Sequence, residues 1–453
     1  MTTLARVFFS AIWFLAGAAA LAAQPNALTL EQLRTRAGQA LSNGDAALGI
    51  ALAEGILVES PNDFQTLVLL SLAHLQLDQT EAAASAARRA YEAGTTSGEK
   101  LQAARIAASV RFNAGHHTRA EWWLRKGVNH AKTPEEEAIV EREFRAIRQR
   151  NPLSVRLGFS IAPSNNINGG ATDRTFSLGD FEFVFNPSSL ALSGIEYSGE
   201  LELSYWLSQS PNHITQAGLY LYGRTYTLSS ASQATVPNLS GSDFGQDQVE
   251  ASLSHRQLLF DGLGPSGISL RTGQVRYGRE PYWRYNKLTL SQNFPVGQIA
   301  TATVLASVED QTSLINIYPD TTVYELRGNY AQGLPNQDIL RLSLLSRYNK
   351  AAFETNTFTE QGAALSYELA KPVLGSRLSV SFGIGMKNYD EFSLSLDGRR
   401  DRYVSLGATA VFEQISYFGF SPSWSIFATK TKSNVTRFST EEITARLGLR
   451  SNF

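Results

Sequence analysis

The sequence predicts a multidomain protein in which an all-α helical-repeat domain precedes an antiparallel transmembrane β-barrel of about 14 strands. Three observations predict this fold class. Apolar and polar residues alternate along many segments after residue 153, longer and shorter polar links alternate between these segments, and residues 34 positions apart match in the first third. A chain of 453 residues is long enough for more than one domain. We expect a signal peptide at 1–23 and domains at 28–150 and 153–453.

The final segment shows the alternation that favours a membrane strand. One face carries Ile443, Ala445, Leu447, Leu449 and Phe453, and the other carries Glu442, Thr444, Arg446, Arg450 and Asn452. A period of two with one apolar and one charged face fits a strand between lipid and a wet lumen. Leu447, Leu449 and the terminal Phe453 resemble the C-terminal signal that hands such barrels to their assembly machinery. An edge strand of a soluble β-sandwich is the alternative for this strand taken alone.

The links between segments predict the strand count. Long polar links are expected at 432–439, 389–401, 350–358, 310–321, 278–285 and 228–246, and short ones near 417–419, 372–375, 335–337, 295–297, 262–267 and 210–212. Long loops outside and short turns inside place both chain ends on the periplasmic side, which requires an even number of strands. About 13 strands follow Ile195, so parity allows only one of 154–162 and 176–185 to cross the membrane.

Residues 28–150 are expected to form stacked helix pairs. Leu33 and Leu67 are 34 residues apart, as are Ile56 and Ala90, and this period is typical of tetratricopeptide repeats. About three units and a cap are the least that should be stable. Thr133 followed by Pro134 and Glu136 predicts the start of the capping helix.

Composition excludes several classes of function. Cysteine is absent, which excludes disulfides, cysteine-based zinc sites and a thiol nucleophile. The net charge of −1 and the lack of a basic tract argue against nucleic acid as a partner. We expect no metal and no other cofactor. His116 and His117 do not indicate a metal site, because adjacent helix positions face apart. Arg6, the apolar residues that follow and a small-residue site at 20–22 predict a cleaved signal peptide, with a retained anchor as the alternative.

The barrel offers little for catalysis. Its two histidines, His213 and His255, are expected near periplasmic turns, away from each other and from any acid–serine pair. Ser–His chemistry needs hydrogen-bond reach between the two side chains. We therefore expect no enzymatic activity.

Several motifs, taken in order, resemble one family. After the first candidate strand come Ala162, Pro163, Ser164, Asn165, Asn166, Ile167 and Asn168, then Ala171 and Thr172; Pro422, Trp424, Ser433, Asn434 and the final strand follow. Together with the domain order, they resemble the surface lipoprotein assembly modifier family of Gram-negative bacteria. That resemblance implies an outer-membrane barrel of fourteen strands behind a periplasmic tetratricopeptide domain.

The resemblance implies a function in protein translocation. Members of the family help particular lipoproteins, and in some cases secreted proteins, to reach the cell surface, so the expected partners are such cargo, the barrel assembly machinery and outer-membrane lipid. For Ser164, Asn165, Asn166, Ile167 and Asn168 two readings stay open, namely local turn chemistry and a role at the barrel mouth or at a seam beside the final strand. An exopolysaccharide exporter or a solute porin is the alternative function.

Overall fold

The computed structural model describes residues 28–178, 181–315, 318–415 and 420–451. The expected signal peptide at 1–23 and the terminal Phe453 lie outside these residues. The chain divides into two compact units at Val140 and Glu141, within the last helix before the barrel.

The helical unit is built from consecutive helix pairs, as expected for tetratricopeptide-like repeats. The helices are α1 (Leu30–Ser42), α2 (Ala46–Glu59), α3 (Phe64–Gln76), α4 (Thr80–Ala93), α5 (Ser97–Asn113), α6 (His117–Val128) and α7 (Pro134–Arg148). Each helix from α1 to α5 packs on the next, up to α6, and α1, α3 and α5 also contact one another in order. The described residues therefore contain three stacked pairs followed by α7, which confirms the helical part of the predicted fold.

Local sequence signals define these helices. The Thr29 and Thr96 side chains cap α1 and α5, and in each case a Gln or Glu three residues later completes a capping box. Thr133 accepts a hydrogen bond from the amide of Glu136 at 3.2 Å, so α7 begins at Pro134 as predicted. None of the helices in the described residues combines the length and apolarity that a membrane-spanning helix needs.

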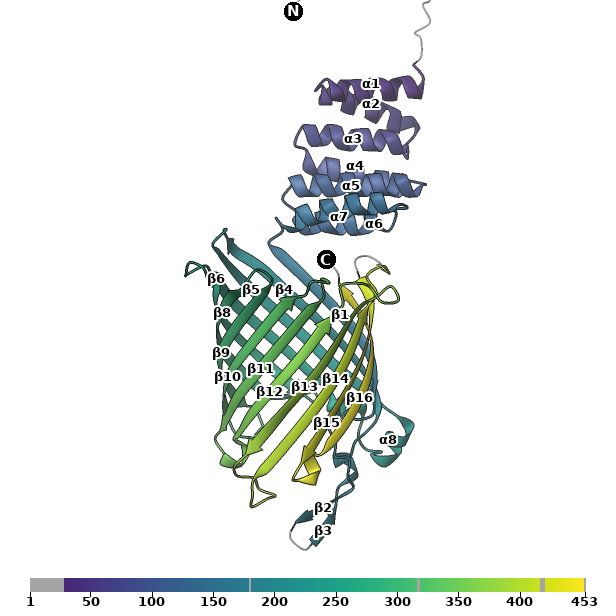
Figure 1. The fold of residues 1–453 in the computed structure, drawn as a ribbon. Helices are drawn as coiled ribbons and strands as arrows, with labels where there is room; N and C mark the ends of the chain where they lie inside the picture. The colour runs from purple at the N-terminus through teal and green to yellow at the C-terminus, as the bar shows by residue number, and fades with distance from the viewer. Residues whose placement is uncertain (1–27, 179–180, 316–317, 416–419, 452–453) are drawn as a thin grey trace, which may run out of the picture. The chain divides into compact units, whose positions relative to one another are not determined.

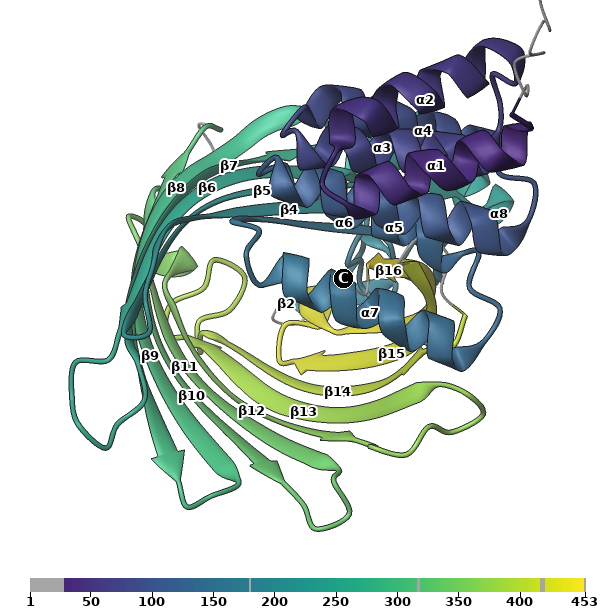
Figure 2. The same ribbon diagram turned by 90° about the horizontal axis from the view of Figure 1, so that it is seen from above.

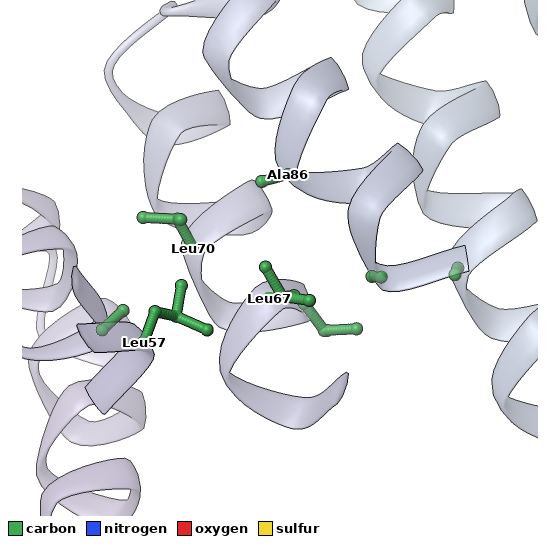
Figure 3. Packing of buried hydrophobic residues seen from close by; sticks show 8 residues of the cluster. Leu57, Leu67, Leu70 and Ala86 are labelled. Carbon is green, nitrogen blue, oxygen red and sulfur yellow. The ribbon is translucent and has the colours of Figure 1, made fainter. Parts of the chain in front are cut away.

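The core of the helical unit is rich in leucine and alanine. Figure 3 shows Leu57, Leu67 and Leu70 converging with Ala86 between neighbouring helices. Leu67 is fully buried, and the alanines of α4 at 83, 84, 86, 87 and 90 are all buried. Small alanine side chains let helix backbones approach closely, which explains the tight stacking of short pairs.

The second unit is a closed antiparallel barrel of 14 strands. The strands are β1 (Leu153–Ser164), β4 (Gly194–Gln209), β5 (His213–Leu228), β6 (Gln246–Gln257), β7 (Ser266–Tyr277), β8 (Glu280–Val296), β9 (Ala300–Ser313), β10 (Thr321–Gly333), β11 (Ile339–Ala351), β12 (Phe358–Glu368), β13 (Arg377–Tyr389), β14 (Arg399–Val411), β15 (Phe420–Ser433) and β16 (Thr440–Ser451). They follow in chain order around the wall, and β1 pairs with both β4 and β16 to close it (Figures 1 and 2).

The structure assigns the first barrel strand to 153–164 rather than to 176–185. Two short strands, β2 (Thr175–Leu178) and β3 (Phe181–Val184), pair antiparallel as a separate two-stranded sheet within the link from β1 to β4. This small sheet lies beside the barrel end that also carries the short helix α8 (Ser230–Thr235) (Figure 1). The requirement for an even number of strands thus correctly predicted that only one of these two segments belongs to the barrel. The count of fourteen strands is confirmed.

One expected long link is wrong. Strand β7 ends at Tyr277 and β8 begins at Glu280, so Gly278 and Arg279 alone connect them. Both have positive φ, 56° and 73°, and a two-residue turn with two positive φ values matches the twist of paired strands. Residues 280–285, expected in a loop, belong to the strand because a register shift between Val275 and Arg276 accommodates them.

The two faces of the wall differ as expected. Large apolar side chains point outward and are exposed, among them Leu326, Leu344, Phe382, Ile384, Leu406, Leu447 and Leu449. Charged residues occupy the alternate positions, such as Glu325 beside Leu326 on β10. Charges facing lipid would each cost a few kcal/mol, whereas exposed leucines in water would favour aggregation. The barrel is therefore a transmembrane barrel with a polar interior.

Candidate functional site at the seam and lumen of the barrel

The seam between β1 and β16 has an interrupted ladder. Register pairs run from Gly158 with Arg450 to Ile161 with Leu447 and resume at Ser164 with Thr444. Between them lies Pro163, which has no amide N–H to donate. By contrast, β1 pairs with β4 at every position from Leu153 to Ser164. The backbone closure of the barrel is thus weaker on the β16 side of β1.

A side chain and a long backbone hydrogen bond together continue the pairing at the end of this seam. The amide of Ile443 donates to Oδ1 of Asn165 at 2.7 Å, and the amide of Asn165 donates to the carbonyl of Ile443 at 3.4 Å. Asn is suited to this role, because its side-chain amide oxygen accepts a hydrogen bond as a backbone carbonyl does. Asn165 therefore extends the interrupted ladder past Ser164.

The next two asparagines hold the chain as it leaves β1. Asn166 is buried, accepts from the amide of Gly170 at 2.8 Å and donates to Gly170 O at 3.0 Å and, more weakly, to Glu441 O on β16 at 3.4 Å. Asn168 donates to the carbonyl of Leu190 at 2.8 Å and accepts from the amide of Leu192 at 2.9 Å. The turn at 165–170 is thus held by its own hydrogen bonds and is also joined to β16.

Gly170 shows how closely this turn packs. A side chain there would place its Cβ 2.2 Å from the backbone carbonyl carbon of Leu190. Ile167 packs from the same turn into a small core with Leu192, Tyr226 and Val236. The link from β1 to β4 is thereby held against the barrel wall near the seam.

An ion pair crosses the seam on the inner side. Arg446 on β16 lies 3.1 Å from Glu196 on β4, although β1 separates these two strands. Ala162 of β1 pairs with Glu196 in register and is fully buried. Its small side chain leaves room for the two long side chains to meet above it. Arg224 on β5 approaches Glu196 to 4.0 Å from the other side.

A cavity adjoins this ion pair. It has a volume of about 620 Å³. Its lining includes Ser164, Asn166, Ile167, Asn168, Glu196, Arg224, Tyr226, Glu442 and Arg446. The structure thus brings most of the motif around residue 166 together with the charged groups of three strands. Sequence reasoning missed Glu196, Arg224 and Arg446 as members of this site, because only the closure of the barrel brings β16 within reach of β4 and β5.

Ser433 and Asn434 lie in a different cluster. Asn434 accepts a hydrogen bond from the amide of Arg400 at 2.6 Å and donates to the carbonyl of Gly398 at 3.0 Å. The Ser433 hydroxyl accepts from the amide of Val435 at 3.1 Å. Asn434 thus connects the last two loops at this end of the barrel, whereas Ser433 stabilises its own loop. Leu447 and Leu449, from the proposed assembly signal, are exposed on the outer face of β16.

The inner wall from β10 to β14 carries a continuous charge network. Arg347 on β11 bridges Glu325 on β10 at 2.8 Å and Glu360 on β12 at 2.9 Å. Tyr403 on β14 donates to Glu360 at 3.1 Å, and Lys387 on β13 lies 3.9 Å from the same carboxylate. Five neighbouring strands are therefore linked on their inner face, which favours a stable wall there in contrast to the seam.

A stripe of acidic and aromatic residues covers the inner wall of β4, β5 and β6. The register places Glu200 beside Tyr222 and Glu202 beside Tyr220, and Tyr220 beside Glu250. The rings of Tyr220 and Tyr222 stack at 6.4 Å between centroids. Glu202, Tyr220 and Glu250 of this stripe line a groove of about 440 Å³. The stripe as a whole could not be predicted from the sequence, because cross-strand register is not a local property.

The expectation that His213 and His255 lie apart is wrong. Their rings stack at 5.9 Å, because β5 and β6 pair and bring Thr215 opposite His255. The nitrogens of His213 contact the hydroxyls of Ser208 at 2.9 Å and Ser210 at 2.7 Å, and Nδ1 of His255 contacts Thr215 at 2.8 Å. In the part of the chain that the structure describes, no three His, Asp or Glu side chains are grouped closely enough to hold a metal ion.

Fold and wall chemistry define the chain as a transmembrane β-barrel preceded by stacked helix pairs. No protein-family model and no curated protein matches the sequence. Among solved structures, the barrel is similar to an anion-selective porin from Comamonas acidovorans, with 10% identity, a TM-score of 0.36, and 66% of this chain and 99% of that chain covered. A BenF-like porin from Pseudomonas fluorescens Pf-5 is similar at 7% identity and a TM-score of 0.37, with coverage of 66% and 98%.

The helical part is similar to a different kind of protein. The type III secretion translocator chaperone SycD from Yersinia enterocolitica matches at 19% identity and a TM-score of 0.25, over 27% of this chain and 85% of that chain. The assignment of the barrel to a membrane rests on its apolar outer wall and polar interior, not on these likenesses.

Proposed function

We propose that this protein is an outer-membrane translocation factor that moves particular lipoproteins or secreted proteins to the surface of a Gram-negative bacterium. The observation that carries the proposal is the joining, in one chain, of stacked helix pairs to a closed barrel with an interrupted seam. Stacked helix pairs form surfaces that bind extended polypeptide segments. A barrel with a polar interior supplies a route through lipid.

The membrane and the orientation follow from the same argument. Antiparallel barrels of this kind belong to the outer membrane, with both chain ends in the periplasm. In that orientation the helical unit meets cargo before it crosses, and the cluster around Asn166 lies at the external end of the seam. We propose that cargo enters the lumen and that the seam parts to pass segments that carry lipid. Leu447, Leu449 and Phe453 would serve the barrel assembly machinery.

A deletion in the native host tests the proposal. Proteomics of protease-shaved cells and of the culture medium should show one or a few lipoproteins or secreted proteins lost from the outside and accumulated in the periplasm. The wild-type chain supplied in trans should restore them, whereas a chain lacking 28–140 should not, provided that its barrel reaches the membrane. An unchanged surface proteome would contradict the proposal.

One observation favours a second candidate. The acidic and aromatic stripe of Glu200, Glu202, Tyr220 and Tyr222 offers stacking surfaces and hydrogen-bond acceptors that suit sugars. An exopolysaccharide exporter would therefore explain the stripe. The same deletion strain separates the two candidates, because loss of surface polysaccharide with an unchanged surface proteome supports export of the polymer.

A further inference from the structure

A cluster of aromatic and basic side chains lies on one part of the helical unit. Tyr91 on α4, Lys100 on α5 and Trp122, Trp123 and Lys126 on α6 meet there, and His130 follows α6. We call these six residues the aromatic–lysine patch. The ammonium of Lys126 lies 4.1 Å from the centroid of the Tyr91 ring and 4.8 Å from each of the two indoles.

The two tryptophans have different environments. Trp123 is buried and packs edge-on against Tyr91, with 5.4 Å between ring centroids. Trp122 is 51% exposed, although it packs on Trp123 at 5.1 Å. The core of the unit accounts for Trp123 but not for the exposed surface of Trp122. A rigid, half-exposed indole is a typical anchor for a binding partner.

The basic groups of the patch repel one another. Lys100 lies 5.9 Å from the same Tyr91 ring, and His130 Nε2 is 2.8 Å from the Tyr91 hydroxyl. Burial lowers the pKa of Lys126, and Lys100 lowers it further, while Glu92 raises it. Burial also lowers the pKa of His130, and both lysines add to that effect. An incoming carboxylate would reduce this repulsion.

We propose that the aromatic–lysine patch binds an acidic segment of an extended polypeptide, with a carboxylate between Lys100 and Lys126 and an adjacent apolar side chain on Trp122. The chemistry favours a peptide over a nucleic acid, because only two lysines converge here and the acidic Glu92 lies beside them. The inference deepens the proposed function and rests on it only in taking this segment to be part of the cargo.

Peptide binding to the purified full-length protein in detergent micelles tests the patch. The probe is a short fluorescein-labelled peptide with glutamates on both sides of a leucine, and its control has glutamines in place of the glutamates. Fluorescence anisotropy should show that the acidic peptide binds and the glutamine peptide binds at least tenfold more weakly, since charge-assisted hydrogen bonds are lost. Added salt should weaken binding of the acidic peptide.

Variants localise the binding. Lys126→Gln and Trp122→Ala should each weaken binding about tenfold, as expected for anchor residues. Lys132→Gln is the matched control, because this exposed lysine belongs to the same unit but not to the patch. Equal affinity of Lys126→Gln and Lys132→Gln, or equal binding of the two peptides, would overturn the inference. So would displacement of the peptide by a single-stranded oligonucleotide at a lower concentration than by unlabelled peptide.

The result is independent of the test of the proposed function. If the peptide binds at the patch while the deletion leaves the surface proteome unchanged, the patch stands and the translocation proposal fails. If the surface proteome changes but the patch variants bind like the control, the translocation proposal stands and the patch fails.

Discussion

Arg446 and Glu196 form an ion pair over a strand that separates them. Their side chains meet at 3.1 Å above Ala162, so β16 is joined to β4 across β1. The pair lies level with the gap that Pro163 leaves in the ladder of β1 and β16. A side-chain contact therefore supports the barrel where its backbone closure is interrupted.

Removing one partner of this pair should destabilise the barrel. In Arg446→Gln the buried Glu196 loses its closest cation and keeps Arg224 at 4.0 Å, and losing a hydrogen bond to a charged group costs about 1.5–3 kcal/mol. We expect the free energy of unfolding in urea, measured on the barrel in lipid vesicles, to decrease by an amount within that range relative to the wild type. The matched control is Arg156→Gln, which removes an exposed partner of Glu202 and should cost less than about 1 kcal/mol. Equal losses in the two variants would refute a special role for the pair.

Asn166 should matter more than its neighbour Asn165. In Asn166→Ala the amide and the carbonyl of Gly170 both lose a buried partner, which should cost about 1–3 kcal/mol. Asn165 is exposed, so water can replace its side chain in Asn165→Ala. Limited proteolysis of 165–193 in intact cells measures the difference. Faster cleavage of Asn165→Ala than of Asn166→Ala would contradict this account. With Asn165, Asn166 and Asn168 all replaced by Ala, normal surface display of cargo would exclude a functional role for the motif.

Locking the seam should stop export. Ser160 and Gly448 are paired across β1 and β16, and a Cβ on Gly448 would lie 3.6 Å from that of Ser160, within the range of disulfides. Because the chain has no cysteine, Ser160→Cys with Gly448→Cys gives one defined bond. We expect surface display of cargo to fall at least tenfold and to recover on reduction.

A matched pair on a continuous ladder provides the control for the seam. Gly218 and Ser252 pair on β5 and β6, where a Cβ on Gly218 would lie 3.8 Å from that of Ser252. The disulfide between Gly218→Cys and Ser252→Cys should leave display unchanged. If both disulfides have the same effect on display, the seam does not part during export.

Acid should weaken the helical unit through His130. Burial, together with Lys100 and Lys126, lowers the pKa of His130, so the folded state binds a proton less readily than the unfolded chain. Its contribution to stability is therefore complete above the unfolded value of about 6.5 and is lost as the pH falls through the folded value. When the pH is lowered from about 7 to 5, the midpoint temperature of unfolding, followed by circular dichroism, should decrease less in His130→Gln than in the wild type. Parallel shifts in the two proteins would show that His130 is not responsible.

Much of the barrel was predictable because its signals are local. Alternation along each segment identified the strands and their outer faces, and parity fixed the number of strands at fourteen. The link at 278–285 was not predictable from composition, because Pro281 and the polar residues near it suggest a loop while a register shift keeps them in β8. Two positive φ values at Gly278 and Arg279 are visible only in the structure.

The site was predictable only in part for a related reason. The residues from Ser164 to Asn168 stood out as a motif, but their contacts with Glu441 and Ile443 join positions far apart in the chain. The meeting of Arg446 with Glu196, and of His213 with His255, depends on strand order and register. Neither is encoded in the residues next to them.

The most direct test of protein translocation through the barrel is to identify the polypeptides that contact its inner wall in growing cells. A photo-reactive phenylalanine derivative is placed at Tyr220, which lies on the inner wall, and in a matched strain at Leu221, which is exposed on the outer face. If the barrel moves protein, irradiation of growing cells should attach the same polypeptides to position 220 that the deletion strain fails to display, and not to position 221. Absence of polypeptide adducts at position 220, in cells whose surface proteins are displayed normally, would contradict protein translocation through this barrel.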